Sequence, residues 1–115
     1  MKKFARSVGL ALEGISYAIR TQSHMRIHML AALLVVVAGF ILALDTIEWS
    51  LIILCMAMVI SAELVNTAIE QTVDLASPAI HPLAKKAKDI AAGAVLLTAI
   101  GAVIIALLIF GKHIW

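Results

Sequence analysis

The sequence predicts an all-α integral membrane protein, with an N-terminal amphipathic helix on the membrane surface followed by three transmembrane helices. Of its 115 residues, 63% are hydrophobic and 14% are charged, and the mean hydropathy is +1.09. Soluble domains are roughly half apolar and about a quarter charged, so a soluble fold of this size would not bury so much apolar surface. The composition disfavours a soluble enzyme, a disordered chain and a nucleic-acid-binding module, and we expect one domain over residues 1–115.

Residues 1–22 have the periodicity of an amphipathic helix. The apolar face of a 3.6-residue wheel carries Phe4, Val8, Ala11, Leu12, Ile15 and Ile19, and the opposite face carries Lys2, Arg6, Glu13 and Arg20. Such a helix lies in the membrane interface with its apolar face toward the acyl chains. A signal peptide is the alternative, but the segment has no compact apolar core ahead of a small-residue cleavage site.

Three apolar runs predict the transmembrane helices, at 27–44, 47–73 and 90–110. The first and third reach about 27 and 31 Å as helices, close to a hydrocarbon core of ~30 Å. The second keeps its helical character as far as Asp74, about 40 Å in all, so we expect its end to project beyond the membrane. Pro78 and Pro82 are expected to end it, because proline lacks the amide hydrogen and disfavours helix in the preceding residue.

The basic residues predict the orientation of the chain in the membrane. Five precede the first span (Lys2, Lys3, Arg6, Arg20 and Arg26), three lie between the second and third spans (Lys85, Lys86 and Lys88), and the loop between the first two spans has none. Because positive charge is retained on the cytoplasmic side, we expect the N-terminus and the 74–89 segment to be cytoplasmic and the C-terminus to lie outside.

One face of the second span carries polar residues. Glu63, Asn66, Glu70 and Asp74 are spaced i, i+3, i+7 and i+11, so they share one side of a helix that runs from the membrane to the cytoplasm. A carboxylate at membrane depth is costly and indicates a functional site. Carboxylates beside lysines suit Mg²⁺ and phosphate, and Glu63 is deep enough to take a proton from a lipid alcohol. We therefore expect MgATP to bind near Glu70.

Two other interpretations fit intramembrane carboxylates. They can bind helices to one another, or they can form a proton or ion conduit. A conduit requires polar groups across the whole bilayer, and the second span has no charged residue from Trp49 to Ala62. In a three-helix monomer Glu63 and Glu70 would face lipid, so a neighbouring subunit is expected to cover them.

Two stretches resemble the signature of the small bacterial membrane-bound diacylglycerol kinase family, namely 62–74 (AELVNTAIEQTVD) and 81–95 (HPLAKKAKDIAAGAV). The resemblance extends over nearly the whole chain. It implies a homotrimer with active sites shared between subunits. The implied reaction transfers the γ-phosphoryl group of MgATP to a membrane lipid alcohol, and nucleic acid is not an expected partner. Arg26-Ile27-His28, His81-Pro82 and Ala92-Gly93 resemble the branch that phosphorylates undecaprenol rather than diacylglycerol.

The resemblance also implies roles for individual residues. Glu63 corresponds to the general base and Asn66 to its neighbour in the site. Glu70 corresponds to a Mg²⁺ ligand. The ATP-binding group corresponds to Asp74, His81, Lys88 and Asp89, with Lys3 as the matching basic residue near the start of the chain.

Gln22 departs from the family pattern. The family carries a second metal-binding glutamate four residues before the arginine of the Arg26-Ile27-His28 run, and this chain has the amide Gln22 there. An amide oxygen can ligate Mg²⁺ but cannot neutralise its charge. Either the site works with weaker metal affinity, or the chain is a catalytically weakened membrane assembly protein.

Overall fold

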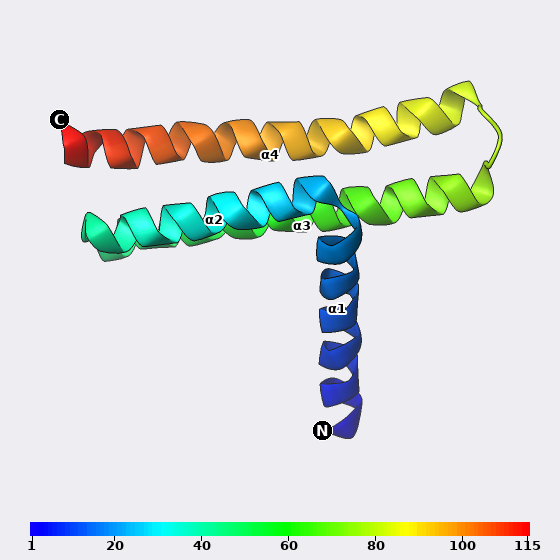
Figure 1. Ribbon diagram of the computed structural model, residues 1–115, viewed down its shortest axis with the longest axis horizontal. Coiled ribbons are helices and arrows are strands. Elements are labelled where there is room, and N and C mark those ends of the chain that lie inside the picture. Colours follow the sequence, from blue (N-terminus) through cyan, green and yellow to red (C-terminus); the bar gives the residue numbers. More distant parts are fainter.

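The computed structural model describes residues 1–115, all of them in four helices and their connections (Figure 1). The helices are α1 (Lys2–Thr21), α2 (Ser23–Ile41), α3 (Thr46–Ala76) and α4 (Pro82–Ile114). The last three are long and apolar enough to cross a membrane. The prediction of an all-helical chain with three long apolar helices is confirmed.

α3 lies in the middle of the bundle and packs against both α2 and α4, whereas the backbones of α2 and α4 stay apart. α3 and α4 run antiparallel as a long hairpin, and α2 lies along only part of it (Figure 1). At ~1.5 Å per residue α2 is about 28 Å long and α3 about 46 Å, so the hairpin extends well past the start of α2. The site residues lie on this half of the hairpin.

The helix ends differ from the predicted bounds for identifiable reasons. α2 ends at Ile41 rather than at residue 44, because Ala43 adopts a left-handed conformation (φ 53°) and Asp45 already caps α3. α3 ends at Ala76, one residue before the loop that holds Pro78. Pro82 does not end a helix but begins α4, eight residues before the apolar run, since the first helical turn needs no amide hydrogen there.

α1 leaves the bundle steeply at the point where α2 begins (Figure 1). Gln22 forms the corner in an extended conformation (φ −114°, ψ 116°). Arg26 holds this corner, because its Nη1 donates to the backbone carbonyls of Ile19 and Arg20, each at 3.0 Å. These carbonyls belong to the last turn of α1, where they have no partner within the helix.

The buried core is small and lies where α2 turns into α3. Leu44, Ile52 and Ile109 form it, with partly buried apolar side chains around them. Only 12 of the 115 residues are buried, and large apolar side chains are exposed along all four helices. So much exposed hydrocarbon requires lipid or neighbouring chains as its surroundings.

Candidate active site

The polar face of α3 becomes more exposed toward the α3–α4 turn. Glu63 is 2% exposed and Asn66 7%, Glu70 is half-buried and Asp74 is exposed. Asn66 Nδ2 donates to Glu70 Oε1 at 2.9 Å, so the amide fixes this carboxylate. Asn66 Oδ1 is buried and has no hydrogen-bond partner. Exposure thus rises along the face toward the turn, and an acceptor oxygen is left free beside Glu70. The single chain already buries Glu63, so the expectation that this carboxylate would face lipid in a monomer is wrong.

Glu63 opens onto a hollow of about 370 Å³ between the three long helices. Its walls come from α2 (His24, Ile27 and His28), from α3 (Glu63 and Asn66) and from α4 (Ala92, Val95, Leu96 and Ala99). The side chains of α4 that line the hollow are all apolar. The hollow therefore combines a carboxylate, an amide and two imidazoles with an apolar wall.

His28 is a site residue that the sequence interpretation did not select. Its Nε2 lies 3.6 Å from Glu63 Oε2, and its side chain is 22% exposed. The Glu63 carboxylate accepts no hydrogen bond, since Thr67 Oγ1 donates to the backbone carbonyl of Glu63 and not to its side chain. The one signal in the sequence was that His28 is the single ionisable residue of the run 27–44.

A second cavity, of about 220 Å³, adjoins the hollow on the side away from the α3–α4 turn. It shares His28 and Ala99 with the hollow, and His28 is its only polar side chain. The remaining walls are apolar and include Ala31, Val35, Ile52, Met56, Val59 and Ala106. The hollow that Glu63 lines thus adjoins an apolar cavity suited to hydrocarbon.

Near the α3–α4 turn, the residues predicted to bind ATP are only partly brought together. Lys88 Nζ donates to Asp74 Oδ1, which joins the two helices. Asp89 instead accepts from Lys85 Nζ at 2.7 Å, and this bond raises the pKa of Lys85. His81 caps α4, its Nδ1 accepting from the Leu83 amide at 3.1 Å.

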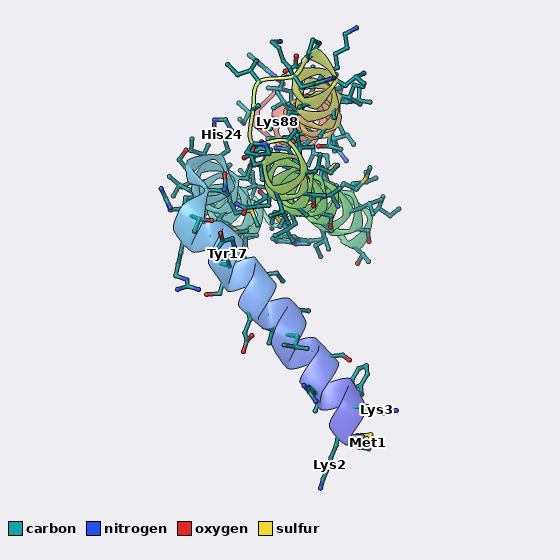
Figure 2. All side chains as sticks on the ribbon, turned by 90° about the vertical axis from the view of Figure 1, so that its right-hand side faces the viewer. Met1, Lys2, Lys3, Tyr17, His24 and Lys88 are labelled. Atoms are coloured by element: carbon teal, nitrogen blue, oxygen red, sulfur yellow. The ribbon has the colours of Figure 1, made fainter.

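Two predicted site residues belong to the N-terminal part of the chain and not to the α3–α4 hairpin. Gln22 is half-buried at the α1–α2 corner. Lys3 lies near the far end of α1, well away from Lys88, while His24 stays beside the bundle (Figure 2). A single chain therefore does not bring Lys3 to the carboxylates of α3.

Three long apolar helices around a buried carboxylate define a polytopic membrane protein with a polar site near one end of its bundle. The family described as prokaryotic diacylglycerol kinase matches residues 9–110. Undecaprenol kinase from Bacillus subtilis (strain 168) is 46% identical over 110 residues, which cover 96% of this chain and 89% of that one.

Two further relatives are named diacylglycerol kinase. The one from Synechocystis sp. is 47% identical over 96 residues, 83% of this chain and 55% of its own length. The one from Escherichia coli (strain K12) is 32% identical over 111 residues, 96% of this chain and 91% of its own length. The chain belongs to the prokaryotic diacylglycerol kinase family and is a membrane-bound, ATP-dependent lipid kinase, which confirms the resemblance seen in the sequence.

Proposed function

We propose that this kinase transfers the γ-phosphoryl group of ATP to the hydroxyl of a lipid alcohol, with Glu63 as the general base. The observation that carries this role is the position of Glu63, which is buried at the wall of the hollow, one helical turn from Val59 in the wall of the adjoining apolar cavity. A lipid whose tail occupies the apolar cavity presents its hydroxyl to this carboxylate. A base within hydrogen-bond reach of a hydroxyl is the first geometric requirement of the reaction.

In the proposed reaction, the hydroxyl proton passes to Glu63 while the lipid oxygen attacks the γ-phosphorus. The bond to the bridging oxygen breaks, and ADP leaves. Such reactions depend mainly on positioning and on neutralising phosphate charge. Asn66 contributes to positioning, because its hydrogen bond holds Glu70 on the same face as Glu63.

The donor set beside Glu63 fits Mg²⁺. Glu70 offers a carboxylate, and the unpaired Asn66 Oδ1 is an acceptor that a metal-bound water would satisfy. No three His, Cys, Asp or Glu side chains converge closely enough to hold a metal by themselves. This agrees with Mg²⁺, which usually takes one or two carboxylates together with phosphates and waters. Glu70 would hold the ion, with Gln22 as a neutral second ligand, and the ion would neutralise the phosphates.

ATP is proposed to bind along the exposed half of the α3–α4 hairpin, through Asp74, His81, Lys88 and Asp89. Lys88 is already directed at α3 by its bond to Asp74, and a lysine supplies a point charge for phosphate oxygens. Glu63 and Asp74 are separated by about 16 Å along the helix. An extended triphosphate between them would direct its γ-phosphate toward the buried base.

Undecaprenol is the proposed acceptor, and diacylglycerol is the alternative. The hydroxyl of a polyprenol is attached to pure hydrocarbon, which matches a cavity whose single polar side chain is His28. Diacylglycerol carries two ester groups close to its hydroxyl, and an apolar wall leaves them without hydrogen bonds, at a cost of roughly 1–3 kcal/mol each. The relative from Bacillus subtilis, named undecaprenol kinase, points the same way.

The active unit is proposed to be a homotrimer in the bacterial cytoplasmic membrane, with the N-terminus and residues 74–89 in the cytoplasm and the C-terminus outside. α1 would lie on the cytoplasmic surface, since it leaves the bundle where the apolar part of α2 begins, and its apolar side chains are exposed. In a trimer, Lys3 of one chain would reach the site of its neighbour.

The decisive experiment is a kinase assay with undecaprenol and diacylglycerol compared side by side in the same bilayer. The purified wild type should transfer labelled γ-phosphate to undecaprenol with the higher kcat/KM. Glu63→Gln should lose at least about 100-fold in kcat, the usual range for a general base, while it assembles normally. Full activity of this variant would contradict the role of Glu63, and a preference for diacylglycerol would contradict the proposed acceptor.

A further inference from the structure

The burial of Glu63 creates a problem for repeated turnover. A base with 2% of its surface exposed has little direct contact with water, yet it must lose the proton that it takes from each lipid hydroxyl. Its carboxylate accepts no hydrogen bond from the protein, and the nearest ionisable group is His28, with Nε2 at 3.6 Å from Oε2. A nitrogen at this separation is within reach of a direct or water-bridged proton transfer after a small movement.

The walls around Glu63 offer no other acceptor at that distance. α4 contributes only Ala92, Val95, Leu96 and Ala99, which do not titrate. α3 contributes Asn66, which cannot carry a proton. α2 contributes His28 and, one turn away, His24 at the exposed rim of the hollow. Among the side chains next to Glu63, His28 is therefore the one that can take up its proton and pass it to water.

We propose that His28 is the acid–base partner that clears the proton from Glu63 after each phosphoryl transfer, an inference that rests on the proposed function. In the resting site, with Glu63 ionised, neutral His28 carries its hydrogen on Nε2 and directs it at the carboxylate. Once Glu63 is protonated, the tautomer of His28 with its hydrogen on Nδ1 presents the Nε2 lone pair to the Glu63 O–H group. The lipid hydroxyl gives its proton to Glu63 Oε2 as its oxygen bonds to the γ-phosphorus and ADP leaves. The proton then passes to His28 Nε2, the imidazolium releases a proton to water in the hollow, and the carboxylate is restored.

Histidine suits this role because imidazole takes up and releases protons near neutral pH. The geometry also distinguishes an acid–base role of His28 from a purely structural role in packing. A side chain that served only to pack would need a suitable volume and shape and nothing more. The side chain of His28 is instead 22% exposed, and its Nε2 faces a carboxylate. Glutamine has a similar reach and can hydrogen-bond to Glu63, but it cannot carry a proton.

Two variants test the proposal in the trimer reconstituted in bilayers with the lipid acceptor. His28→Gln should lower kcat by at least about tenfold while the KM values for ATP and lipid stay within about twofold, because general acid–base groups typically contribute about 10²–10⁴-fold. His28→Ala should be similarly slow, and added imidazole should restore activity in a saturable way, since the hollow of about 370 Å³ has room for it. His113→Gln, at the other end of the bundle, is the matched control. At assay temperatures well below its unfolding midpoint, this variant should have the wild-type kcat.

The outcomes separate the two proposals. If the wild type transfers phosphate and His28→Gln keeps the wild-type kcat, the role of His28 is wrong while the proposed function stands. If imidazole restores nothing to His28→Ala, the role is also wrong; the same protein is compared with and without imidazole, so a folding defect cannot imitate rescue. If the wild type phosphorylates no lipid alcohol, the proposed function fails and the inference about His28 fails with it.

Discussion

His113 and Glu48 join the two ends of the α3–α4 hairpin that lie farthest from the candidate active site. His113 Nε2 lies 2.9 Å from Glu48 Oε2 and 3.0 Å from Oε1, across 65 residues of sequence. Since a carboxylate only accepts, the hydrogen of His113 is on Nε2. Glu48 is buried, and its Oε1 also accepts from the Asp45 amide at 3.0 Å, which completes the capping box at the start of α3.

His113→Ala should therefore loosen the hairpin. Glu48 would remain buried with fewer donors, and a buried acceptor without its partner destabilises the fold. We expect the thermal unfolding midpoint in detergent to fall by a few degrees, as measured by circular dichroism. Lys112→Ala is the control, because its Nζ lies 3.5 Å from Glu48 Oε2 on an exposed side chain and should contribute little. Equal loss in both variants would contradict a specific role of His113.

Gly39 allows α2 to approach the start of α3. A Cβ at this position would lie 2.7 Å from Trp49 Cη2 and 3.1 Å from Leu44 Cδ1, and the Trp49 ring is already packed against Phe40 with centroids 5.0 Å apart. A rigid indole has little room to move. Gly39→Ala should therefore lower the free energy of unfolding by about 1–3 kcal/mol, the usual cost of overpacking, in denaturant titrations of the detergent-solubilised protein.

Gly14→Ala is the matched substitution in open space. Nothing lies within 4 Å of a Cβ at Gly14, which is in the middle of α1. Alanine favours a helix over glycine by up to ~1 kcal/mol, so this variant should be neutral or more stable in the same titration. A comparable loss in both variants would show that glycine flexibility, and not the contact with Trp49, limits stability.

The helices were predictable from the sequence, but their ends were decided by local chemistry. Apolar runs identify the stretches that cross a bilayer and say nothing of a helix that continues into water. α4 therefore begins at Pro82, where His81 caps it, rather than at the first residue of the apolar run. The end of α2 depends on the left-handed Ala43, a conformation that no hydrophobic pattern encodes.

The site was predictable only along one helix. The i, i+3, i+7 spacing places Glu63, Asn66 and Glu70 on one face of α3, since helical periodicity is a local property. The contact of His28 with Glu63 joins α2 to α3, and it depends on how the two helices pack. Because Lys3 lies far from α3 within one chain, its place in the site is a question of assembly and not of the single fold.

Gln22 provides a test of the metal site. Gln22→Glu would place a second carboxylate at the α1–α2 corner, and if this corner faces the bound metal, added negative charge should strengthen binding. We expect half-maximal activity at several-fold lower Mg²⁺ concentration, measured with ATP saturating, and a Gln22→Ala variant should require more Mg²⁺ than the wild type. An unchanged Mg²⁺ requirement in both variants would show that residue 22 is not a ligand in this kinase.

Lys88 provides a test of the ATP site. Its bond to Asp74 places the ammonium group between α3 and α4 on the exposed half of the hairpin, where the triphosphate is proposed to lie. Lys88→Met should raise the KM for ATP by about tenfold or more and leave the KM for lipid unchanged, because a hydrogen bond to a charged group contributes ~1.5–3 kcal/mol. Lys86→Met removes an equal charge from the same helix, and Lys86 is exposed and forms no ion pair. If the two variants raise the KM for ATP equally, the effect comes from the overall charge of the hairpin, and Lys88 does not bind the nucleotide directly.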